Sequence, residues 1–137
     1  MASFCLDTDV IVNILRGTQP LDSFLALVPF GVSTTMITLM ELYYGAYKTG
    51  KEERIALVDS VDKSITVMDI SEDDVKLAGK IMAGLEREGR KVDFRDVVIG
   101  AICINNELIL ITNNVKHFER MESYGLSISN SENISRL

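Results

Sequence analysis

Short, continuously apolar runs alternate with longer helix-like segments along the whole of this 137-residue sequence. The clearest of these runs are residues 3–6 (SFCL) and 108–112 (LILIT). Adjacent apolar residues, rather than alternate ones, are typical of parallel strands that helices cover on both faces of the sheet. We therefore predict an α/β fold, a three-layer α/β/α sandwich with a parallel sheet of four or five strands.

Turn and capping signals divide the rest of the chain. Further strands are predicted at residues 31–35, 64–70 and 126–129. Gly, Pro and Ser residues mark the ends of the intervening helices, for which we predict the ranges 10–17, 20–28, 37–50, 51–62, 71–89, 93–104 and 115–121. No repeat, linker or low-complexity segment interrupts this alternation, so we expect residues 1–137 to form a single domain.

The composition supports a folded domain with an acidic surface. Hydrophobic residues make up 47% of the chain, which excludes intrinsic disorder. The net charge is −6, so the surface as a whole repels phosphate. Any nucleic-acid substrate would therefore require local cationic side chains or a bound cation.

The cysteines and the apolar runs indicate the compartment. Cys5 and Cys103 both lie within apolar runs, which suits buried thiols better than a disulfide or a zinc site. The longest apolar stretches, of about eight to ten residues, are shorter than the ~20 needed to cross a bilayer. An Asp interrupts the N-terminus where a signal peptide would be apolar. We expect a soluble, cytoplasmic protein with no membrane partner.

Two acids follow the first strand, Asp7 and Asp9. Asp7 is placed to cap the following helix by accepting backbone N–H bonds. Asp9 falls in the first helical turn, where a carboxylate interacts favourably with the helix dipole. A structural role is therefore open for both residues.

Two further acids lie in strongly apolar surroundings. Glu41 is in the segment MITLMELYYGAY, which has no wide polar face, and Asp96 directly precedes VVIGAICI. A buried, unpaired carboxylate costs several kcal/mol, so each needs a cation, a proton or hydrogen-bond donors. The alternatives are a satisfied core or rim Glu41, and a capping pair of Asp93 and Asp96.

The predicted topology brings these acids toward one place. In a parallel sheet, the carboxyl ends of the strands and the adjoining helix N-termini meet at a single edge. Asp7 lies there by position, as do Thr112, Asn113 and Asn114 after the strand at 108–112. Carboxylates within ~4 Å of one another repel unless a cation lies between them, and oxygen ligands select Mg²⁺ or Mn²⁺. Such an ion can activate a water against a phosphate ester, so we predict nuclease chemistry without a protein nucleophile.

Three blocks of the sequence resemble, in order and spacing, the signature blocks of the PIN-domain ribonucleases. They are 4–17 (FCLDTDVIVNILRG), 32–46 (VSTTMITLMELYYGA) and 93–121 (DFRDVVIGAICINNELILITNNVKHFERM). The likeness is greatest to VapC-type toxins of bacterial and archaeal toxin–antitoxin pairs, whereas residues 50–90 match only as helical segments. The resemblance implies a metal-dependent endoribonuclease that cleaves single-stranded RNA, with Mg²⁺ or Mn²⁺ as its cofactor.

The resemblance also implies roles for individual residues. Asp7, Glu41 and Asp96 would hold the metal, with Thr8 and Asp9 supporting the first acid, and Thr112 would help to position metal, water or phosphate. Many family members carry a fourth acid where this chain has Asn114 or His117. Asn114 is kept as a metal-ligand candidate through its carbonyl oxygen, and the departure bears on a second metal ion rather than on the first.

Three other interpretations compete with this one. The segment LDTDV also resembles the first motif of haloacid dehalogenase-type phosphohydrolases, but only twenty-five residues remain after Thr112 for the Lys and paired acids of that chemistry. A phosphoacceptor receiver domain would need a late Lys after a strand, which is missing. A non-catalytic, degenerate PIN fold that binds RNA or protein is kept as the alternative, because Asn114 and His117 stand in place of acids.

The sequence contains fewer features that indicate the substrate and the protein partners. Arg16, Arg95 and Lys116, together with Arg120, lie close in sequence to the acids and are the candidate substrate-binding cations. The helix at 37–50 carries more apolar and aromatic residues than one face can bury, which are Leu39, Leu42, Tyr43, Tyr44 and Tyr47. We expect this surplus to serve a homodimer or an antitoxin segment. The resemblance implies both partners.

Overall fold

The computed structural model describes residues 3–132 and contains a five-stranded sheet with helices on both faces. The strands are β1 (Ser3–Leu6), β2 (Val32–Thr35), β3 (Thr66–Met68), β4 (Leu108–Ile111) and β5 (Ser127–Ser129). The α-helices are α1 (Thr8–Leu15), α2 (Pro20–Leu25), α3 (Met36–Thr49), α4 (Glu52–Ser64), α5 (Glu72–Arg87), α6 (Phe94–Asn105) and α7 (Val115–Phe118). Two 3₁₀ helices are η1 (Val28–Phe30) and η2 (Glu119–Tyr124). Among the helices of residues 3–132, none is long and apolar enough to cross a membrane.

All the neighbouring strands of this sheet are parallel, in the order β3-β2-β1-β4-β5. The predicted parallel α/β/α sandwich is confirmed, at the upper end of the predicted strand number. The chain runs from β1 outward to β3 and then returns to β4 on the other side of β1. Leu6 therefore pairs with Ile111, and the carboxyl ends of β1 and β4 lie side by side. This switch point is where α/β sheets usually bind ligands.

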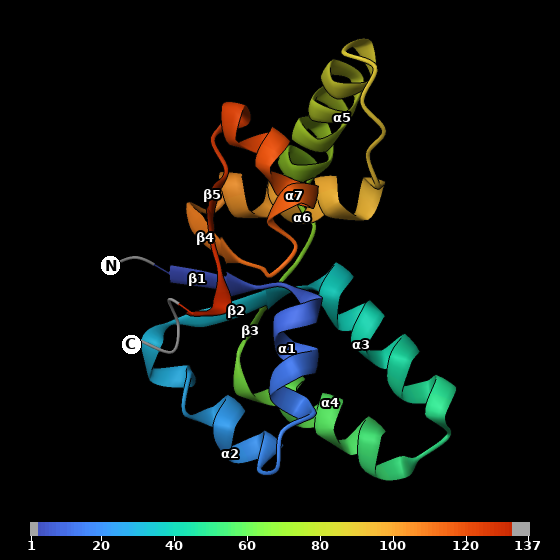
Figure 1. The fold of residues 1–137 in the computed structure, drawn as a ribbon, viewed down its shortest axis with the longest axis vertical. Coiled ribbons are helices and arrows are strands. Elements are labelled where there is room, and N and C mark those ends of the chain that lie inside the picture. Colours follow the sequence, from blue (N-terminus) through green and yellow to red (C-terminus); the bar gives the residue numbers. More distant parts are fainter. Residues whose placement is uncertain (1–2, 133–137) are drawn as a thin grey trace.

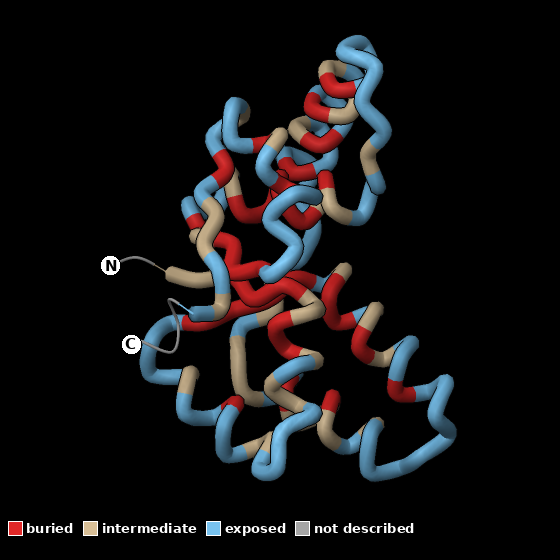
Figure 2. Tube along the Cα trace, viewed as in Figure 1, coloured by how far each residue is buried: buried red, intermediate tan, exposed pale blue. Residues whose placement is uncertain are grey.

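The two faces of the sheet bury two separate apolar clusters. Cys5 and Leu110 point into the cluster beneath α5 and α6, whereas Leu6 and Ile111 point into the cluster beneath α1, α2, α3 and α4. Figure 1 shows these helices on opposite sides of the strands, and Figure 2 shows the buried residues following the strands and the inner turns of the helices. Apolar side chains are needed on both faces, which explains the continuously apolar strands.

The cysteines are both free and buried, as the sequence predicts. Cys5 is on β1 and Cys103 is on α6, so the two thiols belong to the same apolar cluster. A buried thiol packs as a small apolar side chain. The two residues therefore contribute to the layer that holds α6 against the sheet.

The predicted boundaries differ from the structure in two segments. The helix expected at 20–28 ends at Leu25, and the turn η1 follows because Pro29 lacks the N–H that would continue an α-helix. The strand expected at 64–70 is shorter, since β3 lies at the sheet edge and pairs with β2 alone over residues 66–68. Both differences lie away from the carboxyl ends of β1 and β4.

Helix α3 buries part of its apolar surplus and exposes the rest. Leu39 and Leu42 lie in the core, which corrects the expectation that they are available to a partner. The hydroxyl of Tyr43 donates a hydrogen bond to Asp59 on α4. Tyr44 and Tyr47 are exposed by 65% and 62%, so these two aromatic rings remain on the surface of α3.

Candidate active site

Asp7 lies at the carboxyl end of β1 and begins α1. Its Oδ1 accepts a 2.8 Å hydrogen bond from the Thr8 N–H, and its Oδ2 accepts one of 2.8 Å from the Thr112 hydroxyl. The Asp7 N–H donates to the carbonyl of Ile111, which joins this turn to the end of β4. Burial raises the pKa of Asp7 from 3.8 to about 6, although both hydrogen bonds act in the opposite direction. Asp7 is therefore the predicted helix cap, and it is also a carboxylate whose ionised form is disfavoured by burial.

Glu41 reaches the same region from α3. The helix starts directly after β2, where the Thr35 hydroxyl caps it by accepting a bond from the Thr38 N–H. The Thr8 hydroxyl then donates a 2.8 Å hydrogen bond to Oε1 of Glu41. Thr8 thus connects the second acid to the turn that carries the first. The Glu41 side chain is 29% exposed, so it is neither a core residue nor a freely solvated one.

The start of α6 contributes two acids with different partners. Asp93 caps the helix by accepting from the Arg95 N–H, and it also pairs with the Arg95 guanidinium at 2.8 Å. This pairing lowers the pKa of Asp93. Asp96 points instead toward His117, with its Oδ2 3.5 Å from Nδ1. Partial burial, together with the charge of Asp93, raises the pKa of Asp96.

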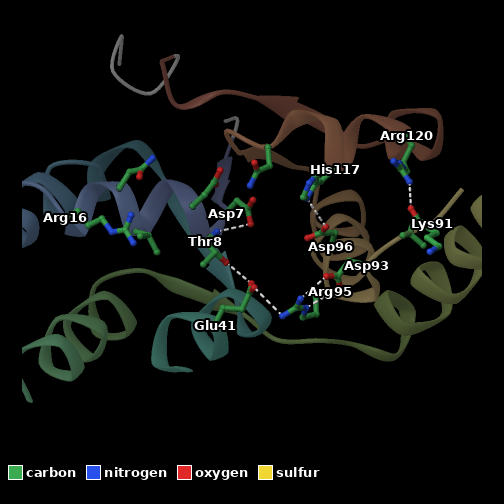
Figure 3. A pocket seen from close by; sticks show the side chains of 15 residues that line it. Asp7, Thr8, Arg16, Glu41, Lys91, Asp93, Arg95, Asp96, His117 and Arg120 are labelled. Carbon is green, nitrogen blue, oxygen red and sulfur yellow. Dashed lines mark hydrogen bonds and ion pairs between the residues drawn. The ribbon is translucent and has the colours of Figure 1, made fainter. Parts of the chain in front are cut away.

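These elements surround a cavity of about 600 Å³ at the carboxyl edge of the sheet. Figure 3 shows the acids of the cavity between Arg16 at one end and Lys91 with Arg120 at the other. The Arg95 guanidinium lies 3.9 Å from Oε2 of Glu41, so one cation is already among the acids. The lining residues are Asp7, Thr8, Asp9, Val12, Asn13, Arg16, Glu41, Lys91, Val92, Asp93, Arg95, Asp96, Asn114, His117 and Arg120.

Most of the residues singled out from the sequence meet at this cavity. Those that line it are Asp7, Thr8, Asp9, Glu41, Asp96, Asn114, Arg16, Arg95 and Arg120. Thr112 does not line it, because its side chain is fully buried behind Asp7. Lys116 is exposed on α7 and is not among the lining residues, because the side chain of its neighbour His117 turns toward the cavity instead.

Two residues that line the cavity, Lys91 and His117, were not among the ligands and cations predicted from the sequence. Lys91 lies in the segment between α5 and α6, where its residue type suggested only a helix end. The Arg120 guanidinium donates to the Lys91 carbonyl and so ties η2 to that segment. His117 carried one signal, since it stands where the resemblance leads one to expect an acid. The structure places its imidazole against Asp96.

The donor atoms suit a hard divalent ion that keeps part of its water. Within residues 3–132, no three Asp, Glu, His or Cys side chains form a ready-made metal cage. The negative charges of the acids nevertheless repel one another. Asp7 is buried, and the charges of Asp9 and Asp96 raise its pKa further. In the described part of the chain, Oδ1 of Asp9 is buried and lacks a hydrogen-bond partner. Carboxylate oxygens of this kind fit Mg²⁺ or Mn²⁺ with water completing the shell.

Comparison with known protein families gives a match over most of the chain. The family described as PIN domain matches residues 4–123. Ribonuclease VapC2 of Haemophilus influenzae is 31% identical over 127 residues, which cover 88% of this chain and 93% of that protein. The tRNA(fMet)-specific endonuclease VapC of Shigella flexneri is 33% identical over 123 residues, with the same shares covered, 88% and 93%.

Solved structures agree with the sequence relatives. The DNA-bound VapBC of Salmonella typhimurium superposes with a TM-score of 0.80 at 31% identity, covering 95% of this chain and 98% of that one. VapBC-5 of Mycobacterium tuberculosis, a member of the VapBC family of toxin-antitoxin systems, superposes with a TM-score of 0.69 at 26% identity over 95% and 98% of the two chains. With a family match from residue 4 to residue 123 and relatives above 30% identity across most of its length, the chain belongs to the PIN domain family.

Proposed function

We propose that this chain, acting as one domain over residues 1–137, is a divalent-metal-dependent endoribonuclease and the toxin of a toxin–antitoxin pair. The observation that carries the proposal is the meeting of Asp7, Glu41 and Asp96 at one cavity in a PIN domain. The relatives named ribonuclease or endonuclease support the reaction class. Cellular RNA is the substrate, so the cytoplasm is the place of action.

In this proposal Asp7, Glu41 and Asp96 hold the ion, and Asn114 and Asp9 supply further oxygens beside them. When bound, the ion lowers the pKa of a water and offsets the negative charge that develops on the phosphate. The chain's own residues orient the acids. Thr112 and the Thr8 N–H fix the two oxygens of Asp7, and the Thr8 hydroxyl fixes Glu41.

The cations around the acids give RNA a way to approach an acidic protein. Arg16 lies on the α1 side of the cavity, and Lys91 and Arg120 lie on the other side (Figure 3). A single strand that contacts both ends would pass over the acids between them. Arg95 lies near the acids and is held by Asp93, so it is oriented toward the reacting phosphate. Arg120 is one of the cations that the sequence suggested, and Lys91 takes the place that it suggested for Lys116.

The proposed antitoxin has a surface next to this cavity. A second hollow of about 290 Å³ lies between α1, α3 and α4, and it shares Val12, Arg16 and Glu41 with the acidic cavity. Its other walls include Leu15 and Leu57, which are partly exposed. An amphipathic antitoxin segment laid here would cover apolar side chains and also obstruct the acids. The VapBC complexes among the structural relatives support such a partner.

A cleavage assay on single-stranded RNA tests the proposal. We expect cleavage with Mg²⁺ or Mn²⁺ and none with EDTA. Asp7→Asn, Glu41→Gln and Asp96→Asn should each lower the rate by about a hundredfold or more, because each amide keeps the volume but loses the ligand charge. Asp73→Asn, at an exposed position of α5, is the matched control and should keep full activity.

The same assay distinguishes the proposed nuclease from the non-catalytic alternative. A degenerate PIN fold would bind RNA in a gel-shift experiment with the metal present and leave it intact. Full activity in any one of the three cavity variants would remove that residue from the proposed site. Equal losses in Asp73→Asn and Asp96→Asn would point to an effect on folding, which circular dichroism of each variant measures directly.

A further inference from the structure

His117 is a nitrogen donor placed among the oxygen donors of the cavity. It lies on α7, directly after β4, where the buried Phe118 anchors the helix in the core. The following 3₁₀ helix packs closely on α6, since a Cβ added at Gly100 would lie 2.6 Å from the Met121 sulfur. These two anchors fix α7 and the 3₁₀ helix after it against the core, and the His117 imidazole lies beside Asp96 at the start of α6. Its Nδ1 lies 3.5 Å from Oδ2 of Asp96 (Figure 3).

The separation of these two atoms suits a shared ligand. Metal bonds from imidazole nitrogen and carboxylate oxygen are about 2.0–2.2 Å long. Two such donors on one ion are therefore about 3.0 Å apart at a right angle and about 3.5 Å apart at a tetrahedral angle. The His117 and Asp96 atoms are already within this range, so little movement is needed for both to bind the same ion.

We propose that His117 and Asp96 together bind one divalent ion, and that the imidazole gives this site a preference for first-row transition ions over Mg²⁺. Mg²⁺ favours an octahedron of oxygens, whereas imidazole favours transition ions, whose affinities for nitrogen ligands rise along the series from Mn²⁺. The inference rests on the metal-binding part of the proposed function. It specifies which ion the acids hold and through which additional side chain.

The sequence makes this inference open to a direct spectroscopic test. The chain contains one histidine in 137 residues, so any imidazole nitrogen bound to a metal belongs to His117. Mn²⁺ is paramagnetic, and a nitrogen bonded to it modulates the electron spin echo. The test uses the whole chain without a histidine tag, loaded with Mn²⁺ at pH 8, because an imidazole must be neutral to bind a metal.

We expect directly bonded ¹⁴N modulation in the wild-type protein and its loss in His117→Gln. Glu119→Gln, an exposed position next to α7, is the control and should keep the signal. An Mn²⁺-loaded wild type without nitrogen modulation would overturn the inference, and so would a signal that persists in His117→Gln. The wild-type spectrum decides the question even if the variants fold poorly.

Calorimetric titration measures the preference itself. His117→Gln should weaken Mn²⁺ binding by about tenfold or more while Mg²⁺ binding changes little. His117→Glu, which restores an oxygen ligand, should move the preference toward Mg²⁺. Equal losses for both ions would contradict a role of the imidazole in selection.

The readouts separate this inference from the proposed function. A nitrogen signal in a protein that cleaves no RNA would sustain the metal pair and reject the nuclease. Cleavage of RNA with Mg²⁺, in a protein whose bound Mn²⁺ gives no ¹⁴N modulation, would support the nuclease and reject the metal pair of His117 and Asp96.

Discussion

The Thr112 hydroxyl donates a 2.8 Å hydrogen bond to Oδ2 of Asp7, across 105 residues of sequence. Thr112 is fully buried, and its own oxygen accepts a bond from the Asn114 N–H. The hydroxyl is therefore fixed from both sides and orients the Asp7 carboxylate from behind. This arrangement makes Thr112 a positioning residue for the acid rather than a ligand in the cavity.

Replacing Thr112 with valine should lower the stability of the protein, because the buried Asp7 charge loses a hydrogen bond. The hydrogen bond lowers the pKa of Asp7, so its loss raises that pKa further and disfavours the ionised form. We expect the free energy of unfolding to fall by about 1–3 kcal/mol at pH 7.5 and by less at pH 4.5. Urea titrations at the two pH values measure the difference. Thr112→Ser keeps the donor and should lose much less, and an equal loss at both pH values would contradict the prediction.

The raised pKa of Asp7 predicts how stability depends on pH without metal. The folded-state pKa is about 6 against an ordinary 3.8, so the folded protein holds this proton more tightly than the unfolded chain does. As pH rises from about 4 to above 6, the unfolded chain ionises first, and the folded state loses about 3 kcal/mol of stability. Asp7→Asn should therefore be more stable than the wild type at pH 7.5 in EDTA.

The advantage of Asp7→Asn should shrink toward zero near pH 4, where the wild-type carboxyl is protonated in the folded state. Thermal unfolding in EDTA at both pH values checks this. If the wild type and the variant were equally stable at pH 7.5, the ionised Asp7 carboxylate would carry no cost in the folded protein.

Asp96→Asn should stabilise the metal-free protein and should reduce the further stabilisation that metal provides. Burial and the charge of Asp93 raise the pKa of Asp96, so the neutral amide should raise the melting temperature in EDTA at pH 7.5. If the proposed function holds, Mn²⁺ at a hundred times its dissociation constant should stabilise the wild type by about 2.7 kcal/mol, because the ion would bind the folded state. The variant should show a smaller metal-induced shift. An undiminished shift in a less stable variant would assign Asp96 to helix capping alone.

The exposed face of α3 predicts self-association. Met40, Tyr44 and Tyr47 are exposed by 54%, 65% and 62%, and they lie on successive turns of one helix. Exposed apolar groups of this size usually belong to interfaces. We expect a homodimer in analytical ultracentrifugation that Tyr47→Glu dissociates. A wild type that sediments as a monomer at high micromolar concentration would exclude this interface.

Patterns that depend on neighbouring residues predicted the fold well. The apolar run at 108–112 gave β4. The contrast between Glu41 or Asp96 and their apolar neighbours predicted that each acid needs a cation, a proton or hydrogen-bond donors, and in the structure both line the cavity. A strand that is apolar on both faces and a carboxylate without a polar face are both local features. They can be recognised before the fold is known.

Contacts made by tertiary packing were out of reach. Lys91 reaches the cavity because Arg120 holds its carbonyl, and the two lie in segments that no local pattern connects. The approach of Arg95 to Glu41 depends on the angle between α6 and α3. Whether Lys116 or His117 faces the cavity depends on how α7 is rotated about its axis. A helix of four residues is too short for its sequence pattern to define that rotation.

The parallel pairing of β1 with β4 has a consequence for synthesis of the chain. Residues 3–6 leave the ribosome before their partner, residues 108–111, and Asp7 remains without the Thr112 hydroxyl until that strand has emerged. The sheet, and with it the surroundings of Asp7, therefore stays incomplete until β4 has emerged. The nuclease proposed here would therefore remain inactive while the residues between β1 and β4 are being synthesised.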